Sequence, residues 1–358
     1  MRNIVEALIR PEIIKLSAYH VPESDDMIKL DAMENPYQWS SDIEEKWLEK
    51  LKMVNINRYP DPTAKIVVNA LRQAMNIPQK ADVILGNGSD ELIQNIAMAV
   101  AKPDSCILAP SPSFVMYQMI ALSCQLGFIP TPLNADFSLN LQQTKALIKQ
   151  HQPAVTFLAY PNNPTGNLFD RDELMELIEI SSGLVVIDEA YAPFTDCTLM
   201  NLAGQIDNLL VMRTVSKMGL AGLRLGLLAG IPDLIQQFDK VRLPYNINSL
   251  TQASIEFALE NQNIFNQQTN IIRQQRQKLL DQLKQFKQLT AYPSQANFIL
   301  FKLHEIDASE VFNQLKDHGI LIKNMNQPNT LLDNCCRVTI GKPEENEQFL
   351  KVLSCLIN

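Results

Sequence analysis

The sequence predicts an α/β protein: a large domain with a mainly parallel sheet sandwiched by helices, followed by a smaller α+β domain. Between residues 82 and 228, short apolar runs rich in β-branched residues alternate with longer segments of helical periodicity. Runs that are apolar at successive positions are typical of strands buried on both faces, as in a parallel sheet covered by helices. The runs lie at 83–85, 106–109, 155–159, 184–187, 209–212 and 225–229.

The length of the chain and a change of pattern after Pro244 predict the domain organisation. A chain of 358 residues is too long for one simple core. The first forty residues alternate apolar and charged positions and contain three prolines, which suits an arm that packs on other elements. We therefore expect an N-terminal arm at 1–40, a large domain at 41–245 and a small C-terminal domain at 246–358.

Composition and charge exclude several classes of protein. The formal net charge of −8 argues against a nucleic-acid binder, because phosphate backbones need clustered Lys and Arg. No apolar run approaches the length of a membrane-spanning helix, and the charged N-terminus lacks the core of a signal peptide, so we expect a cytoplasmic protein. The six cysteines have neither CxxC spacing nor a His cluster nearby, which predicts reduced thiols and no metal site.

Prolines and capping residues mark the expected helix ends. Helices are expected at 42–54 and 64–75, with the proline-containing segment 58–62 between them. Asp170 and Glu173 have capping-box spacing ahead of an apolar stripe that ends at Gly183. In the C-terminal part we expect a helical stretch at 251–289, strands at 297–303, 320–323 and 337–340, a helix at 308–317 and a last helix from Pro343.

The segment 211–224 carries the strongest indication of chemistry. It follows an apolar strand and places Ser216 and Lys217 before a turn of small residues that ends in Arg224. A lysine amine can form a Schiff base with the aldehyde of pyridoxal phosphate, and Ser216 and Arg224 can bind its phosphate. Taken alone, a surface lysine after a buried strand explains the segment better, because Ser-Lys pairs are common.

Loops after two other predicted strands would join Lys217 at the carboxyl edge of the sheet, where such sheets bind ligands. Gly88, Ser89 and Asp90 follow the first strand and open a helix, whose exposed amides can bind phosphate. A tight turn capped by Ser or Asp is an equal alternative. Phe114 lies beyond the second strand, where its ring can stack on a flat cofactor or belong to the core.

Two further loops carry polar residues that can bind a cofactor. Asn163 lies in the rigid, proline-bounded turn 160–166, which can fix its amide at the strand end or form a plain loop. Asp188 ends a fully apolar strand, where a buried carboxylate is costly without a charged partner. A protonated pyridine nitrogen is such a partner, and a helix-capping role for Asp188 is the alternative.

Together these residues resemble the fold type I pyridoxal-phosphate aminotransferases over nearly the whole chain. The ordered set is Gly-Ser-Asp, an aromatic residue, Asn-Pro-Thr-Gly, Asp-Glu-Ala-Tyr, Ser-Lys and Arg. Within this group the chain is most similar to the histidinol-phosphate aminotransferases. That similarity rests on Glu34-Asn35-Pro36, Arg58-Tyr59-Pro60, the SPSFxMY run through Tyr117, and the segments 220–224, 296–298 and 337–341.

The resemblance implies a role for each matched residue. Lys217 would bond to the cofactor aldehyde and move the substrate proton, and Asp188 would keep the pyridine nitrogen protonated. Phe114 would stack on the cofactor ring, while Asn163 and Tyr191 would bond its hydroxyl oxygen. The phosphate would be held by Gly88, Ser89, Asp90, Ser216 and Arg224, and by Tyr59 of a second subunit, which implies a homodimer. The implied substrate ligands are Tyr19, Asn35, Tyr245 and Arg337.

The implied reaction is reversible amino transfer between glutamate and imidazole-acetol phosphate, which gives histidinol phosphate in histidine biosynthesis. Two departures from the family pattern concern the substrate and the phosphate. The spacing from Lys217 to Arg224 is one residue shorter than in much of the family, and Lys323 stands where an arginine is often found. The alternatives are an aromatic or aspartate-type aminotransferase, a threonine-phosphate decarboxylase of the same fold, and a cofactor-binding regulator without turnover.

Overall fold

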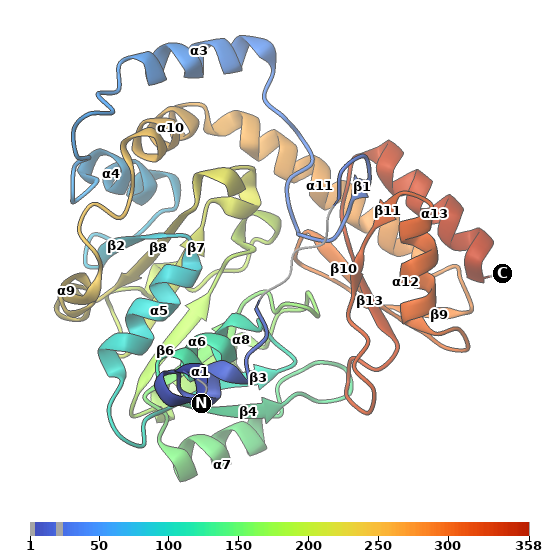
Figure 1. The fold of residues 1–358 in the computed structure, drawn as a ribbon, viewed down its shortest axis with the longest axis horizontal. Helices are drawn as coiled ribbons and strands as arrows, with labels where there is room; N and C mark the ends of the chain where they lie inside the picture. The colour runs from blue at the N-terminus through green and yellow to red at the C-terminus, as the bar shows by residue number, and fades with distance from the viewer. Residues whose placement is uncertain (1–3, 19–23, 358) are drawn as a thin grey trace.

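The computed structural model describes residues 4–18 and 24–357 and contains a large sheet and a small sheet, each with its own helices. The long helix α11 (Gln262–Leu283) runs from the helices above the large sheet to the small one, as Figure 1 shows. The domain boundaries expected at residues 40 and 245 stay a prediction.

The large sheet lies in the first two thirds of the chain. Its described strands run in the order β2-β8-β7-β6-β5-β3-β4, and neighbours are parallel except that β8 is antiparallel to both β7 and β2. The mainly parallel α/β class is therefore confirmed. The strands are β2 (Asp82–Asn87), β3 (Cys106–Ser111), β4 (Gly127–Pro132), β5 (Val155–Ala159), β6 (Leu184–Asp188), β7 (Leu209–Thr214) and β8 (Leu225–Gly230).

Helices cover both faces of this sheet because successive strand residues point to opposite sides. In β7, Leu209 and Val211 pack into one core cluster, whereas Leu210 and Met212 pack into another. The second cluster includes helices α5 (Ser89–Val100), α6 (Met116–Ser123) and α9 (Pro232–Val241). The first includes α4 (Lys65–Ala74), α7 (Leu141–His151), α8 (Arg171–Ile180) and α10 (Ser249–Glu260).

Local signals in the sequence explain where several helices begin. The Asp170 carboxylate accepts hydrogen bonds from the backbone amides of Asp172 and Glu173, as its capping position predicts. The helical stretch expected at 251–289 is wrong as one unit, because it is two helices, α10 and α11, that meet at Asn261. The asparagine ends α10 with a side-chain bond to the Phe257 carbonyl.

The small sheet has the described strand order β12-β13-β10-β9 and packs on α11, α12 (Ala308–Asp317) and α13 (Pro343–Ile357). Its strands are β9 (Leu289–Ala291), β10 (Phe298–Leu303), β12 (Lys323–Asn324) and β13 (Cys335–Thr339). The single strand expected at 320–323 is two short strands, because β11 (Ile320–Leu321) pairs instead with β1 (Ile28–Lys29). The segment before residue 40 is thereby held against the small sheet region.

The remaining described elements are short, apart from α3 (Ser41–Lys52), which lies at the edge of the molecule in Figure 1. Within the described ranges, no helix is both long and apolar enough to cross a bilayer. The short helices are α1 (Ile4–Leu8), α2 (Pro11–Ile14), η1 (Ala192–Phe194), η2 (Met200–Leu202), η3 (Ser216–Met218) and η4 (Ala221–Leu223).

Candidate active site

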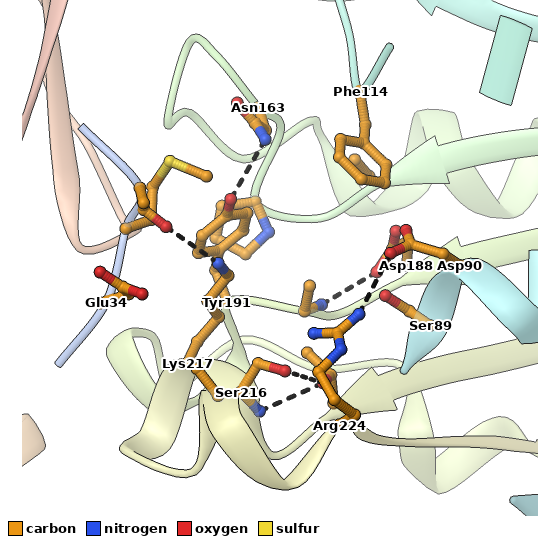
Figure 2. Close-up of a pocket in the computed structure, with 17 residues that line it drawn as sticks. Glu34, Ser89, Asp90, Phe114, Asn163, Asp188, Tyr191, Ser216, Lys217 and Arg224 are labelled. Atoms are coloured by element: carbon orange, nitrogen blue, oxygen red, sulfur yellow. Dashed lines mark hydrogen bonds and ion pairs between the residues drawn. The ribbon is translucent and has the colours of Figure 1, made fainter. Parts of the chain in front are cut away.

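A cavity of about 220 Å³ lies where the loops after β2, β3, β5, β6 and β7 meet the segment 32–34 (Figure 2). Parallel strands bring their carboxyl ends to one edge of the sheet, so loops far apart in the sequence converge there. Most of the residues expected to bind a cofactor line this cavity: Ser89, Asp90, Phe114, Asn163, Asp188, Tyr191, Ser216, Lys217 and Arg224.

One end of the cavity is built to hold an anion. Gly88, with a φ of 84°, precedes the first turn of α5 and exposes the amides of Ser89 and Asp90. The guanidinium of Arg224 lies 3.4 Å from the Asp90 carboxylate and close above Gly88, where a Cβ would come within 2.6 Å of it. Arg224 therefore reaches the helix end despite the shorter turn between Lys217 and itself.

Thr214 fixes the turn that carries Ser216 and Lys217. The Thr214 hydroxyl accepts the backbone N–H of Ser216 at 3.1 Å and donates to the Leu225 carbonyl at 2.9 Å. It also lies 2.9 Å from the Ser216 hydroxyl. These bonds tie the end of β7 to the start of β8, so η3 begins in a defined position beside the helix end of α5.

Lys217 points into the cavity from η3 (Figure 2). Its Nζ donates to the Ala32 carbonyl at 3.4 Å and lies 5.8 Å from the centre of the Tyr191 ring. Burial lowers the pKa of Lys217 to about 8, and the positive charge of Arg337 acts in the same direction. An amine with such a pKa is neutral in an appreciable fraction of molecules near pH 8 and can act as a nucleophile or a base.

Asp188 ends β6 on the floor of the cavity and is only 4% exposed. One carboxylate oxygen accepts the Ala190 backbone N–H at 3.0 Å and the other accepts the Tyr117 hydroxyl at 2.7 Å. Burial raises the pKa of Asp188 to about 6, although both hydrogen bonds act in the opposite direction. Among the described residues it forms no ion pair, so a cation placed beside it would relieve the cost of burial.

A chain of hydrogen bonds links the large sheet to the small one across the cavity. The Asn163 amide donates to the Tyr191 hydroxyl at 3.1 Å, and its oxygen accepts from Arg337 at 2.6 Å. Arg337 also donates to the Asp31 carbonyl at 3.0 Å and lies over the Phe298 ring. Both Asn163 and Tyr191 thus present their polar groups at one side of the cavity, with the predicted substrate residue Arg337 behind them.

Two other predicted substrate residues, Asn35 and Tyr245, are not among the residues that line the cavity. Asn35 uses its amide for bonds to the Met218 carbonyl and the Gln268 side chain, and its oxygen accepts the Tyr37 N–H. Tyr245 stacks on Tyr59 at 4.4 Å between ring centres, and the Tyr59 side chain is 79% exposed. Tyr19 lies outside the described residues.

Some cavity residues could not be assigned from the sequence. Glu34 belongs to the Glu34-Asn35-Pro36 motif, from which the sequence predicts no role for its carboxylate, and it lines the cavity on the side opposite the Arg224 guanidinium (Figure 2). Its carboxylate pairs with Lys29 at 2.7 Å. The hydroxyl of Thr214 at the end of an apolar run is a feature by which the sequence could have indicated this residue. Ala32 and Met33 have no polar side-chain group, so nothing in the sequence marks them as cavity residues.

The donor set fits the phosphorylated pyridine aldehyde that the resemblance implies. The anion end offers the N-terminal amides of α5 and the Arg224 guanidinium, which the Asp90 carboxylate holds at 3.4 Å beside the helix end. Asp188 can meet a protonated ring nitrogen, and Lys217 offers an amine to the same cavity. Among the described residues, no cluster of His, Cys, Asp and Glu could hold a metal ion.

Comparisons with known proteins agree with this geometry. Residues 25–353 match the family model for class I and II aminotransferases. The chain is 51% identical over 352 residues to histidinol-phosphate aminotransferase 2 of Nitrosococcus oceani, covering 98% of each chain. It is 48% identical to histidinol-phosphate aminotransferase of Chromobacterium violaceum, covering 99% of each.

A solved structure has the same fold. The histidinol-phosphate aminotransferase of Sinorhizobium meliloti in complex with pyridoxal-5'-phosphate superposes with a TM-score of 0.86 at 21% identity and covers 98% of each chain. The expected fold type I architecture is therefore confirmed. With the family match over most of its length and relatives near 50% identity, this chain belongs to the class I and II aminotransferase family.

Proposed function

We propose that this enzyme is a pyridoxal-phosphate-dependent transaminase that interconverts histidinol phosphate and 2-oxoglutarate with imidazole-acetol phosphate and glutamate. The observation that carries the proposal is that one cavity brings together the buried amine of Lys217, the buried Asp188 carboxylate and an anion-binding end at Ser89 and Arg224. Full-length relatives named as histidinol-phosphate aminotransferases support the choice of substrate. A role in histidine biosynthesis follows from that substrate.

The cofactor would be held at three points. Its phosphate would lie among Ser89, Ser216 and Arg224, with the N-terminal amides of α5 opposite its charge. Phe114 would cover the ring face, and Asn163 and Tyr191 would bond the ring hydroxyl oxygen. When bound, pyridoxal phosphate supplies an aldehyde for the substrate amine and a ring that accepts the electron pair left at the substrate carbon.

Lys217 and Asp188 would manage the protons. The lowered pKa of Lys217 leaves a neutral amine that would take a proton from the substrate carbon and deliver it to the cofactor. Asp188, once paired with a cationic ring nitrogen, would stay ionised and hold the ring proton in place. Each residue is fixed by its own strand end, so neither needs to move far.

The substrate phosphate would meet two cations of the small sheet. Lys323 on β12 lies directly opposite Arg337 on β13 in the antiparallel register, so both side chains leave the same face of the sheet. Arg337 already reaches Asn163 at the cavity. A lysine offers a point charge instead of a planar fork, so Lys323→Arg would strengthen phosphate binding and Lys323→Ala would weaken it.

The test is a titration of the visible absorption band of the purified, cofactor-loaded protein. Histidinol phosphate should bleach the band at the lowest concentration, and 2-oxoglutarate should restore it. Glutamate, histidine, phenylalanine and phosphothreonine are the comparison ligands. A stronger response to an unphosphorylated amino acid would refute the phosphate substrate, and release of carbon dioxide from phosphothreonine would favour the decarboxylase.

A homodimer with shared active sites is part of the proposal. Met53, Ile56 and Tyr59 are each about 80% exposed in one chain, and they follow α3 closely. Large apolar side chains that are this exposed and follow one another within a short segment are typical of a surface that another protein covers. Light scattering at micromolar concentration should give twice the mass of one chain, and a monomer that is fully active would refute the shared site. We further propose that the enzyme is cytoplasmic.

A further inference from the structure

One buried side chain contacts two of the residues that surround the proposed cofactor ring. Tyr117 on α6 is fully buried, and its hydroxyl donates to Asp188 Oδ2 at 2.7 Å. The same ring meets Phe114 edge to face, with 5.5 Å between centres and 87° between planes. Tyr117 therefore touches both the acid expected at the ring nitrogen and the aromatic expected on the ring face.

The position of Tyr117 is itself rigid. Its ring stacks on Phe157 of β5, with 4.7 Å between centres and 12° between planes. Because the hydroxyl sits at the far end of a ring packed on two sides, the position of its oxygen beside Asp188 is fixed. Burial raises the pKa of Tyr117 well above its usual value, so the hydroxyl keeps its proton and remains a donor.

Each oxygen of the Asp188 carboxylate accepts one of the two hydrogen bonds. Oδ1 is occupied by the Ala190 N–H and Oδ2 by Tyr117, which fixes the plane of the group. An ionised carboxylate has about four lone-pair sites, so sites remain for a further donor. A ring nitrogen that approaches through the cavity therefore meets an acceptor whose orientation is already set.

We propose that Tyr117 is the positioning residue of the cofactor ring, which orients the Asp188 carboxylate and holds Phe114 against the ring face. This inference rests on the proposed function, because it requires a cationic ring nitrogen beside Asp188. Tyr117 is not among the residues that line the cavity, so it would act on the cofactor only through its two neighbours. A purely structural tyrosine would fill the same space without affecting the ring.

The test is Tyr117→Phe, which removes the hydroxyl and keeps the ring packing. We expect the cofactor dissociation constant of the apo-protein to rise about 10- to 100-fold, as for loss of a hydrogen bond to a charged group. In steady-state transamination from glutamate, kcat should fall while the KM for glutamate changes less than twofold. Tyr292→Phe is the matched control, since Tyr292 packs edge to face on Phe137 away from the cavity and should behave as the parent protein.

A double-mutant cycle separates positioning from packing. If Tyr117 acts through Asp188, adding Tyr117→Phe to Asp188→Asn should change cofactor affinity less than twofold. An equal loss in both backgrounds, or wild-type affinity and kcat in the single variant, would overturn the inference. Both outcomes leave the proposed function intact, whereas a parent protein that binds no cofactor overturns both. If the cofactor-loaded protein does not react with histidinol phosphate, only the proposed substrate is overturned.

Discussion

Gly88→Ala should weaken cofactor binding more than it weakens the fold. Gly88 has a φ of 84° and a ψ of 168°, a region that is essentially restricted to glycine and costs other residues about 1–3 kcal/mol. For a chain of 358 residues this corresponds to a loss in Tm of about 1–4 °C. The new Cβ would also lie 2.6 Å from the Arg224 guanidinium, which must move away. Losing one charge-assisted phosphate contact costs about 1.5–3 kcal/mol, or about 10- to 100-fold in cofactor affinity.

Two measurements on matched variants separate the effect of backbone strain at the substituted glycine from the effect of displacing Arg224. Gly319→Ala is the control, because Gly319 also has a positive φ of 77° but a Cβ there meets no atom within 4 Å. Thermal unfolding of the apo-protein should show a lower Tm for both variants. Titration with pyridoxal phosphate should show weaker binding only for Gly88→Ala. Parent-like cofactor affinity in Gly88→Ala would refute the placement of Arg224 at the phosphate.

Three further predictions concern residues whose roles differ. Lys217→Ala should still bind the cofactor without a covalent bond but lose nearly all turnover of glutamate; a substantial half-reaction, followed by absorption, would contradict the assignment. The pKa of Asp188 is higher in the folded protein than in the unfolded chain, so the free energy of unfolding falls as the pH rises from about 4 to 6. In urea unfolding at pH 8, apo Asp188→Asn should therefore be more stable than the parent protein by about 3 kcal/mol, and at pH 3.5 it should show no gain. Asn35→Ala should lower stability by about 1–3 kcal/mol, because Gln268 and the Tyr37 N–H lose their partner; a raised KM at unchanged stability would instead favour a substrate role.

Strands of the large sheet that are buried on both faces could be predicted from the sequence, whereas the partly exposed edge strand β4 could not. The six apolar runs each lie within a strand of the large sheet, because such strands need apolar residues at every position. β4 was missed since it is partly exposed and contains Pro130 and Pro132. An edge strand tolerates proline because one side of its backbone needs no ladder partner. The break at Asn261 was missed because helical periodicity continues on both sides of it.

The chemistry of single residues was visible in the sequence, but their partnerships were not. Lys217 and Asp188 could be singled out because each follows an apolar strand, where a charge is unusual. Nothing local indicates that Tyr117, 71 positions before Asp188, donates to its carboxylate. Likewise, the Asn35 amide is a group that could bind substrate, but it donates instead to the Met218 carbonyl and so holds the η3 segment that carries Lys217.

The electrostatics of the cavity favour the cofactor over the empty site. Burial raises the pKa of Asp188 and lowers that of Lys217, so each group is less stable in its charged form than in water. A cationic ring nitrogen beside Asp188 and a covalent bond at Lys217 would remove both costs, while the phosphate would neutralise Arg224. Since the protein bears these costs only while the site is empty, the same contacts that direct the chemistry also stabilise the loaded fold.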